Sequence, residues 1–153
     1  MPRKAKVRAF QAPKGMNDVL PGVAKYWEKF FKEAKELAAF YSFETIETPI
    51  VEDAELFRKG IGLNTDVIEH EMYTLKTKGG DFLALRPELT AGGVRAYLEN
   101  GFQSQPQPVK FFHYGPVFRH EAPQAGRYRQ FHQCDFDVFG EADPVVDAQV
   151  IQV

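Results

Sequence analysis

Residues 109–141 read VKFFHYGPVFRHEAPQAGRYRQFHQCDFDVFGE, and this stretch says most about the fold. Aromatic and β-branched residues dominate its two ends, 109–121 and 129–141, whereas the intervening APQAGRY holds proline, glycine and basic residues. The pattern is typical of two β-strands joined by an exposed connection, so we predict a hairpin. Alternate residues of a strand share a face. One face of the second strand is therefore expected to carry Phe131, Gln133, Asp135 and Asp137.

The predicted hairpin also holds the densest polar cluster of the sequence. Its members are Arg119, His120, Glu121, Arg127, Arg129, Gln130, His132, Gln133, Asp135 and Asp137. A sheet face with guanidinium groups, carboxylates and an aromatic ring is able to bind a phosphate, hold an amine and stack a base. Cross-strand ion pairs on a solvated hairpin explain the same spacing, and the spacing alone favours that simpler interpretation.

The sequence before the hairpin predicts a helix followed by a strand. Apolar residues at three-and-four spacing, with lysine and glutamate between them, predict a helix over 23–41. Residues 42–52 switch to β-branched and aromatic side chains and predict a strand. Pro49 is expected to break this strand or place it at a sheet edge, because proline cannot donate a ladder hydrogen bond.

Glycine, asparagine and proline mark the remaining elements. A tight hairpin is expected around the glycine pair in residues 78–80, and a helix over 89–99 despite two internal glycines. Asp143 is a plausible cap and Pro144 a plausible first residue for a last helix. The apolar face predicted for that helix consists of Val145, Val146, Val150 and Ile151.

Composition places the chain among ordinary soluble globular proteins. The 153 residues are 44% apolar and 26% charged, with a formal net charge of −2, which excludes the bulk positive field of a non-specific nucleic-acid binder. A single cysteine, Cys134, favours a cytoplasmic location, and no apolar run approaches the ~20 residues that span a bilayer. Residues 1–12 are expected to form a solvated basic arm.

Other motifs for catalysis or metal binding are weak. Glu88 and Thr90 stand where a strand is predicted to end and a helix to begin, a position where such residues usually act as caps. The histidines lack the spacing of a metal site and the chain has no cysteine pair, so no metal site is predicted. Glycine-rich phosphate loops and the GxSxG elbow are absent from the sequence.

Four segments, covering most of residues 13–142, carry a resemblance to a known family. They read PKGMNDVLP, TPIVEDAELFRKGIGLNTDVIEHEMYTL, LRPELTAGGVRAYLENG and GPVFRHEAPQAGRYRQFHQCDFDVFGE. In sequence and order they resemble the histidyl-tRNA synthetases, which are class II aminoacyl-tRNA synthetases. The resemblance implies an α+β fold, an antiparallel sheet flanked by helices, in which residues 13–153 form the amino-terminal portion of the catalytic domain. Residues 23–52 resemble motif 1, which builds the family's homodimer interface, and residues 110–141 resemble motif 2.

The resemblance also implies which residues bind ATP. Arg119 is expected to be the catalytic residue, binding the ATP α-phosphate and the carboxylate region of the substrate histidine. Glu121 is expected to contact the adenine amino group, and Phe131 to stack on the adenine ring. Arg127 is expected to reach toward the terminal phosphates, from a loop that also approaches the tRNA acceptor end.

A second set is implied for histidine. Glu88, Thr90 and Gln133 correspond to residues that hold the α-amino group. Asp137 stands where the family places an acid against the imidazole, and bacterial members often have glutamate there. Asp137 is thus a shorter variant of that acid.

The implied activity is ATP-dependent activation of L-histidine to histidyl-adenylate, followed by transfer to the acceptor end of tRNA(His). ATP with Mg²⁺ is then a substrate, and no structural metal is expected. An alternative is the regulatory subunit of ATP phosphoribosyltransferase, which shares this fold and senses histidine without charging tRNA. The nucleotide-contacting residues favour the enzyme over this sensor. A third possibility is an independent dimerisation or binding module.

The family's motif 3 and its anticodon-binding domain are absent from these 153 residues, so the catalytic sheet is expected to be incomplete at the C-terminus. We therefore predict that this chain alone binds ATP and histidine weakly at best and has little or no activity. Histidine-dependent ATP–pyrophosphate exchange measures this, and robust exchange by the isolated chain would contradict the prediction.

Overall fold

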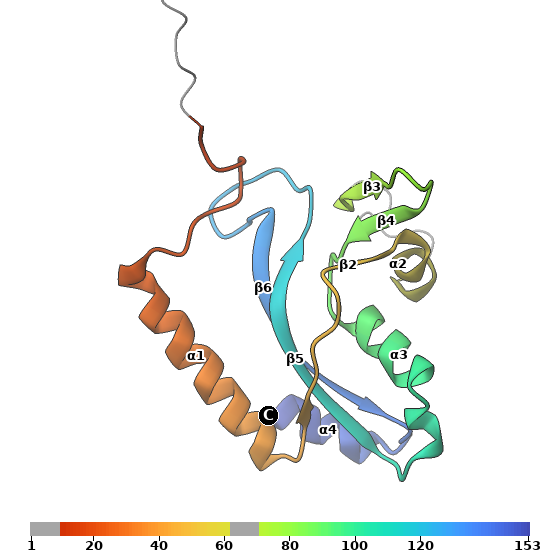
Figure 1. Cartoon of the computed structure of the whole chain (residues 1–153). Helices are drawn as coiled ribbons and strands as arrows, with labels where there is room; N and C mark the ends of the chain where they lie inside the picture. The colour runs from red at the N-terminus through yellow and green to blue at the C-terminus, as the bar shows by residue number, and fades with distance from the viewer. Residues whose placement is uncertain (1–9, 62–70) are drawn as a thin grey trace, which may run out of the picture.

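The structure, a computed structural model, describes residues 10–61 and 71–153 and belongs to the predicted α+β class (Figure 1). Its helices and strands, in chain order, are α1 Pro21–Phe40, β1 Glu44–Thr45, β2 Val51–Asp53, α2 Ala54–Ile61, β3 Thr74–Lys76, β4 Phe82–Leu85, α3 Thr90–Glu99, the 3-10 turn η2 Phe102–Ser104, β5 Val109–Phe118, β6 Gln130–Phe139 and α4 Pro144–Gln152. Helices flank the sheets, as expected.

The long hairpin predicted from residues 109–141 is the centre of the first sheet. β5 and β6 pair antiparallel along their whole length, from Val109 opposite Phe139 to Phe118 opposite Gln130. β1 runs parallel to β5 along its other edge, so this sheet is mixed rather than wholly antiparallel. Both strands are shorter than predicted: β5 ends at Phe118, and β6 begins at Gln130 and ends at Phe139.

The second sheet has the strand order β2-β4-β3 and is antiparallel throughout. Its β3–β4 turn confirms the hairpin predicted around residues 78–80. Gly80 has φ +102°, a conformation that glycine adopts without the steric cost of a side chain. The break predicted at Pro49 is confirmed: β1 and β2 are separate strands on either side of Pro49, and they lie in different sheets.

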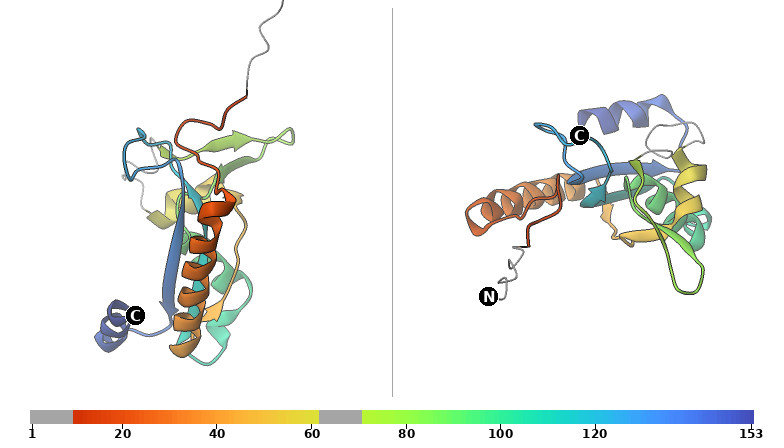
Figure 2. Two further views of the ribbon diagram at one scale, coloured as in Figure 1. Left: turned by 90° about the vertical axis from the view of Figure 1, so that its left-hand side faces the viewer. Right: turned by 90° about the horizontal axis from the view of Figure 1, so that it is seen from above.

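α1 packs along one face of the β5–β6 hairpin, and two perpendicular views show it lying lengthwise on the strands (Figures 1 and 2). The Trp27 ring lies 4.9 Å from the ring of His132, and the Phe31 ring lies 4.6 Å from that of Tyr114. The helix predicted over 23–41 is thus confirmed, although it begins slightly earlier, at Pro21. Proline is favoured in the first turn of a helix, because an N–H group there would have no partner within the helix.

α3 packs close to the opposite face of the hairpin, and its two internal glycines allow this. A Cβ added to Gly92 would lie 3.0 Å from Thr48 Oγ1. One added to Gly93 would lie 3.1 Å from His113 Cε1 and 3.3 Å from Asp137 Oδ2. The glycines lower helix propensity, but they let the helix backbone approach groups that are fixed in the sheet.

Two helices differ from the sequence prediction in detail. α2 was not predicted, although Asp53 Oδ1 accepts a hydrogen bond of 2.8 Å from Glu55 N and so caps its start. In α4, Asp143 caps as predicted, accepting from Val145 N at 2.9 Å. The apolar face predicted for α4 is largely unburied, because Val145 is 71% exposed and Ile151 86% exposed.

Most of the predicted basic arm, residues 1–9, lies outside the described residues. Within residues 10–61 and 71–153, no helix combines the length and apolar character needed to cross a bilayer.

Arg86 joins the two sheets. Its guanidinium is buried and donates to Pro116 O at 2.9 Å and to Thr48 O at 2.8 Å. Its backbone N–H donates to Ile50 O, and its carbonyl accepts from Phe118 N. Burying a cation is costly when no carboxylate is in hydrogen-bond contact with it. Burial therefore lowers the pKa of Arg86, and the negative charges of Glu47 and Glu52 partly offset this decrease.

We predict that Arg86→Met lowers the free energy of unfolding by roughly 2–4 kcal/mol, because two buried carbonyl oxygens lose their donors. Urea denaturation of the 153-residue chain measures this. Lys29→Met is the matched control, because Lys29 is 73% exposed in a surface pair with Glu33 and should cost at most about 0.5 kcal/mol. Equal losses in the two variants would show that Arg86 does not link the sheets.

Candidate functional site

The candidate site lies on the face of β5 and β6 that α1 leaves uncovered, beside the start of α3 (Figure 1). The register places Gly115 opposite Gln133, and Val117 opposite Phe131. Gly115 leaves room on this face for the Arg86 guanidinium, since a Cβ there would clash with Arg86 Nη2. The alternation predicted for β6 is confirmed: His132 faces α1, on the other side of the sheet.

Arg119 is held at the end of β5 by contacts on both sides. Its Nε donates to Pro87 O at 2.9 Å, and its backbone N–H donates to Arg129 O at 3.0 Å. Its guanidinium carbon lies 5.1 Å from the centre of the Phe131 ring, a cation–π contact. The structure therefore brings together two residues that the sequence assigned to ATP.

Glu121 and Arg127 face each other in the loop between the strands. Arg127 Nε lies 3.4 Å from Glu121 Oε2, and the Arg127 side chain is 64% exposed whereas that of Glu121 is 14% exposed. Arg129 Nε donates to Glu121 O at 3.0 Å, and Arg129 N donates to Gly15 O at 2.7 Å. The loop base is thus fixed to the N-terminal segment, while the Arg127 guanidinium extends into solvent.

The acidic end of the site is formed by α3 and β6. Both Glu88 carboxylate oxygens accept from Ala91 N, at 3.0 and 3.2 Å, so Glu88 also satisfies the first turn of α3. Thr90 Oγ1 donates to Asp137 Oδ1 at 3.4 Å. Glu88 therefore caps the start of α3, as expected, and the contact of Thr90 places Asp137 beside the same helix end.

Burial raises the pKa of two carboxyl groups here. For Glu88, desolvation is the main cause of the raised pKa. The charges of Asp135 and Asp137 raise it further, whereas hydrogen bonds from the backbone N–H groups of Ala91 and Thr90 lower it. For Asp135, desolvation is again the main cause of the raised pKa. The charge of Asp137 raises this pKa further, and His113 lowers it. Three acids crowded on one half-buried face form a site prepared for a cationic ligand.

Buried acceptors without a hydrogen bond point to the same conclusion. Among the described residues, Gln133 Oε1 and Glu121 Oε2 are buried and accept no hydrogen bond, although Arg127 Nε lies 3.4 Å from Glu121 Oε2. Buried acceptors are normally satisfied. Donors from a ligand, such as an ammonium or an exocyclic amine, would satisfy them.

Two residues of this site received no role from the sequence pattern or from the family resemblance. Asp135 was grouped with the polar cluster only, and His113 was considered only as a metal ligand. In the structure His113 is 1% exposed and its Nε2 lies 2.7 Å from Asp137 Oδ2. The signal was the hairpin register, which places His113 directly opposite Asp135. Among the described residues, no three acidic, histidine or cysteine side chains are grouped to hold a metal ion.

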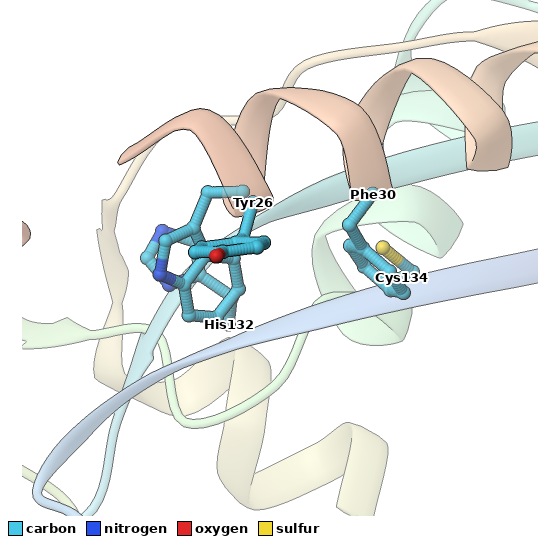
Figure 3. Close-up of a pocket in the computed structure, with 5 residues that line it drawn as sticks. Tyr26, Phe30, His132 and Cys134 are labelled. Atoms are coloured by element: carbon cyan, nitrogen blue, oxygen red, sulfur yellow. The ribbon is translucent and has the colours of Figure 1, made fainter. Parts of the chain in front are cut away.

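Cavities lie on both faces of the hairpin. One of about 510 Å³ adjoins the acidic end and is lined by Leu56, Lys59, Gly60, Glu88, Thr90, Ala91 and Val94. Another, of about 390 Å³, lies between α1 and β6 on the opposite face of the sheet (Figure 3). Figure 3 shows Tyr26 and Phe30 from α1 above His132 and Cys134 from β6. Its lining is mainly apolar and lacks the acids and arginines of the site.

A protein-family profile described as tRNA synthetase class II core domain (G, H, P, S and T) matches residues 73–151, about half of the chain. The chain belongs to this family. The match includes Glu88, Arg119 and the whole β5–β6 hairpin, so the site described above lies inside the class II core.

This class II core is similar to histidine–tRNA ligases. It is 52% identical over 139 residues to the histidine–tRNA ligase of Desulforudis audaxviator, an alignment that covers 91% of this chain and 33% of that protein. The structure of apo histidyl-tRNA synthetase from S. aureus superposes with a TM-score of 0.79 at 37% identity, over 94% of this chain and 33% of the other. The chain spans about a third of the length of the curated relatives it matches.

A further structure shares the fold of this class II core. It is described as an ATP phosphoribosyltransferase regulatory subunit/histidyl-tRNA synthetase from Bacillus halodurans. Its TM-score is 0.79 at 24% identity, over 95% of this chain and 36% of the other. At that identity the similarity concerns the fold alone.

We predict that Asp135→Asn stabilises the chain at neutral pH. The folded-state pKa of Asp135 is raised, so the folded protein binds this proton more tightly than the unfolded chain does. The carboxyl therefore favours folding most at low pH and loses that contribution as the pH rises through the folded pKa. The variant should gain about 0.5–2 kcal/mol at pH 7 and little near pH 3.

Urea denaturation at the two pH values measures this difference. Glu36→Gln, on the exposed face of α1 and 67% exposed, is the matched control and should change stability by less than about 0.5 kcal/mol at both. A gain for Asp135→Asn that is as large at low pH as at neutral pH would contradict the assigned cause.

Proposed function

We propose that this class II core acts in a histidine–tRNA ligase, activating L-histidine with ATP and transferring it to tRNA(His) in the cytoplasm. One observation carries the proposal: a guanidinium stacked on an aromatic ring, Arg119 on Phe131, stands at one end of a face whose other end holds three carboxylates. Nucleotide phosphates suit the first group, and a cationic amino acid suits the second. The names of the relatives at about 50% identity agree with this assignment.

The proposed nucleotide contacts lie around Arg119. Its guanidinium neutralises the α-phosphate and the carboxylate of histidine, which otherwise repel one another as the bond forms. Phe131 stacks on adenine, and Glu121 Oε2, which accepts no hydrogen bond among the described residues, accepts from the adenine amino group. The exposed Arg127 reaches the terminal phosphates of ATP, which enters with Mg²⁺ as substrate. No structural metal is proposed.

The proposed amino-acid contacts lie at the acidic end. The carboxylate of Glu88, the hydroxyl of Thr90 and the buried Gln133 Oε1 receive the α-ammonium group, whose three donors match these acceptors. Asp137 accepts from the imidazole of the substrate. Holding histidine at several points places its carboxylate next to the α-phosphate, and such positioning supplies much of the rate in phosphoryl and nucleotidyl transfer.

The chemistry follows in two displacements. A carboxylate oxygen of histidine attacks the α-phosphorus, and pyrophosphate leaves with the bonding electrons, which gives histidyl-adenylate. A ribose hydroxyl at the acceptor end of tRNA(His) then attacks the histidyl carbonyl, and AMP leaves. Arg119 is the catalytic residue in the first step because it faces the charge that develops on the α-phosphate oxygens.

We also propose a homodimer through residues 23–52, the region resembling motif 1. α1 leaves a row of apolar side chains exposed: Val23, Tyr26, Phe30, Leu37 and Phe40. Tyr26 is 65% exposed and Phe40 is 80% exposed, which is unusual for an apolar helix stripe in a monomer. A second copy of the same region is the proposed partner.

The test uses a chimeric ligase in which this chain replaces the matching third of the D. audaxviator enzyme. We expect histidine-dependent ATP–pyrophosphate exchange and tRNA(His) charging. Arg119→Ala should lower kcat/KM for exchange on the order of 10²–10³-fold, the usual cost of removing a donor to transition-state charge.

Arg58→Ala is the matched control, because Arg58 lies 5.1 Å over the Phe82 ring, the same kind of contact placed outside the site. It should leave kcat/KM within about twofold. A chimera that binds histidine but supports neither exchange nor charging would favour the regulatory-subunit alternative. Equal losses in the two arginine variants would contradict the role of Arg119.

A further inference from the structure

His113 lies beneath the acidic end of the site and makes one polar contact with its side chain in the part of the chain that the structure describes. Its ring is in the middle of β5, 1% exposed, and its Nε2 lies 2.7 Å from Asp137 Oδ2. Among the described residues, Nδ1 is buried without a partner. An ionised carboxylate oxygen accepts and does not donate, so the short contact with Asp137 places a proton on Nε2. His113 therefore donates to Asp137.

The surroundings leave the pair little freedom. Gly93 of α3 comes so close that a Cβ would lie 3.1 Å from His113 Cε1 and 3.3 Å from Asp137 Oδ2. The neighbouring strand positions hold Phe111, opposite Asp137, and Asp135, opposite His113. The other Asp137 oxygen, Oδ1, accepts a long hydrogen bond of 3.4 Å from Thr90 Oγ1. Asp137 Oδ2 is thus held by His113, and Asp137 Oδ1 lies toward Thr90 at the start of α3.

We propose that His113 is the positioning residue for Asp137 and, through it, for recognition of the substrate imidazole. This inference rests on the proposed function. Aspartate is one methylene shorter than glutamate, so its carboxylate contacts a ligand only in a narrow range of orientations. The hydrogen bond from His113 Nε2 selects that orientation before histidine arrives, and Oδ1 is left to accept from the ligand. A preorganised acceptor binds more tightly than one that must be ordered on binding.

Steady-state kinetics of the chimeric ligase test the proposal. His113→Leu removes the donor and should raise KM for histidine on the order of tenfold, while KM for ATP stays within about twofold. His113→Gln retains an N–H at a similar reach and should recover most of the loss. His132→Gln, on the opposite face of β6, is the matched control and should leave both KM values within about twofold.

Several outcomes would overturn the inference. An unchanged KM for histidine in His113→Leu would do so, as would equal rises in KM for histidine and ATP, which indicate a general loss of structure. Failure of His113→Gln to differ from His113→Leu would also count against it. Absence of exchange activity in the unmutated chimera would instead contradict the proposed function, so the two failures are distinguishable.

A second measurement addresses the geometry without any activity. Long-range ¹H–¹⁵N NMR spectra of the 153-residue chain report which ring nitrogen of each histidine carries the proton. We expect His113 to be protonated at Nε2 and its resonances to shift more in Asp137→Asn than in Asp143→Asn. A proton on Nδ1 alone, or equal shifts in both variants, would refute the positioning role even if the chimera is inactive.

Discussion

The buried guanidinium of Arg86 is the interaction on which the arrangement of the two sheets depends. Its donors reach carbonyl oxygens of Thr48, before β2, and of Pro116, in β5. The backbone of the same residue bonds to Ile50 and Phe118. Because Pro87 and Glu88 follow directly, the contact that joins the sheets also fixes where α3 begins. Arg119 donates a hydrogen bond to Pro87 O, so the segment that follows Arg86 holds both Arg119 and Glu88 in place.

The site itself is held in an arrangement that is costly without a ligand. Glu88 and Asp135 have raised pKa values because burial and neighbouring acids disfavour their charged forms. Gln133 Oε1 and Glu121 Oε2 accept no hydrogen bond among the described residues. Such costs are typical of functional sites, where stability is given up so that a ligand of the right charge finds its partners already in place.

Local sequence patterns predicted the elements whose signals are strong. The β5–β6 alternation, the apolar spacing of α1 and the glycine turn before β4 were all confirmed, because each reflects a period or a backbone constraint that acts within a few residues. α2 was missed, since it is short and lies in a segment where only the Asp53 cap marks a start. The exposure of Val145 and Ile151 was not predictable, because it depends on what packs against α4.

The sequence predicted some residues of the site and missed others. Spacing alone grouped the arginines, acids and Phe131, and the family resemblance supplied their roles, but neither indicated His113. A histidine in an aromatic strand looks like a core residue until the register places it beneath Asp137. Gly93 was likewise noted only as a weak point in a helix, whereas it is the place where the helix closes over this pair.

One face of the β5–β6 hairpin is proposed to bind histidine at its acidic end and ATP at the Arg119 end. A crystal structure of the chimeric ligase with a non-hydrolysable histidyl-adenylate analogue tests this assignment. We expect the ammonium group beside Glu88 and Gln133, the imidazole beside Asp137 and adenine on Phe131. An analogue bound between α1 and β6, in the apolar cavity of Figure 3, would contradict it.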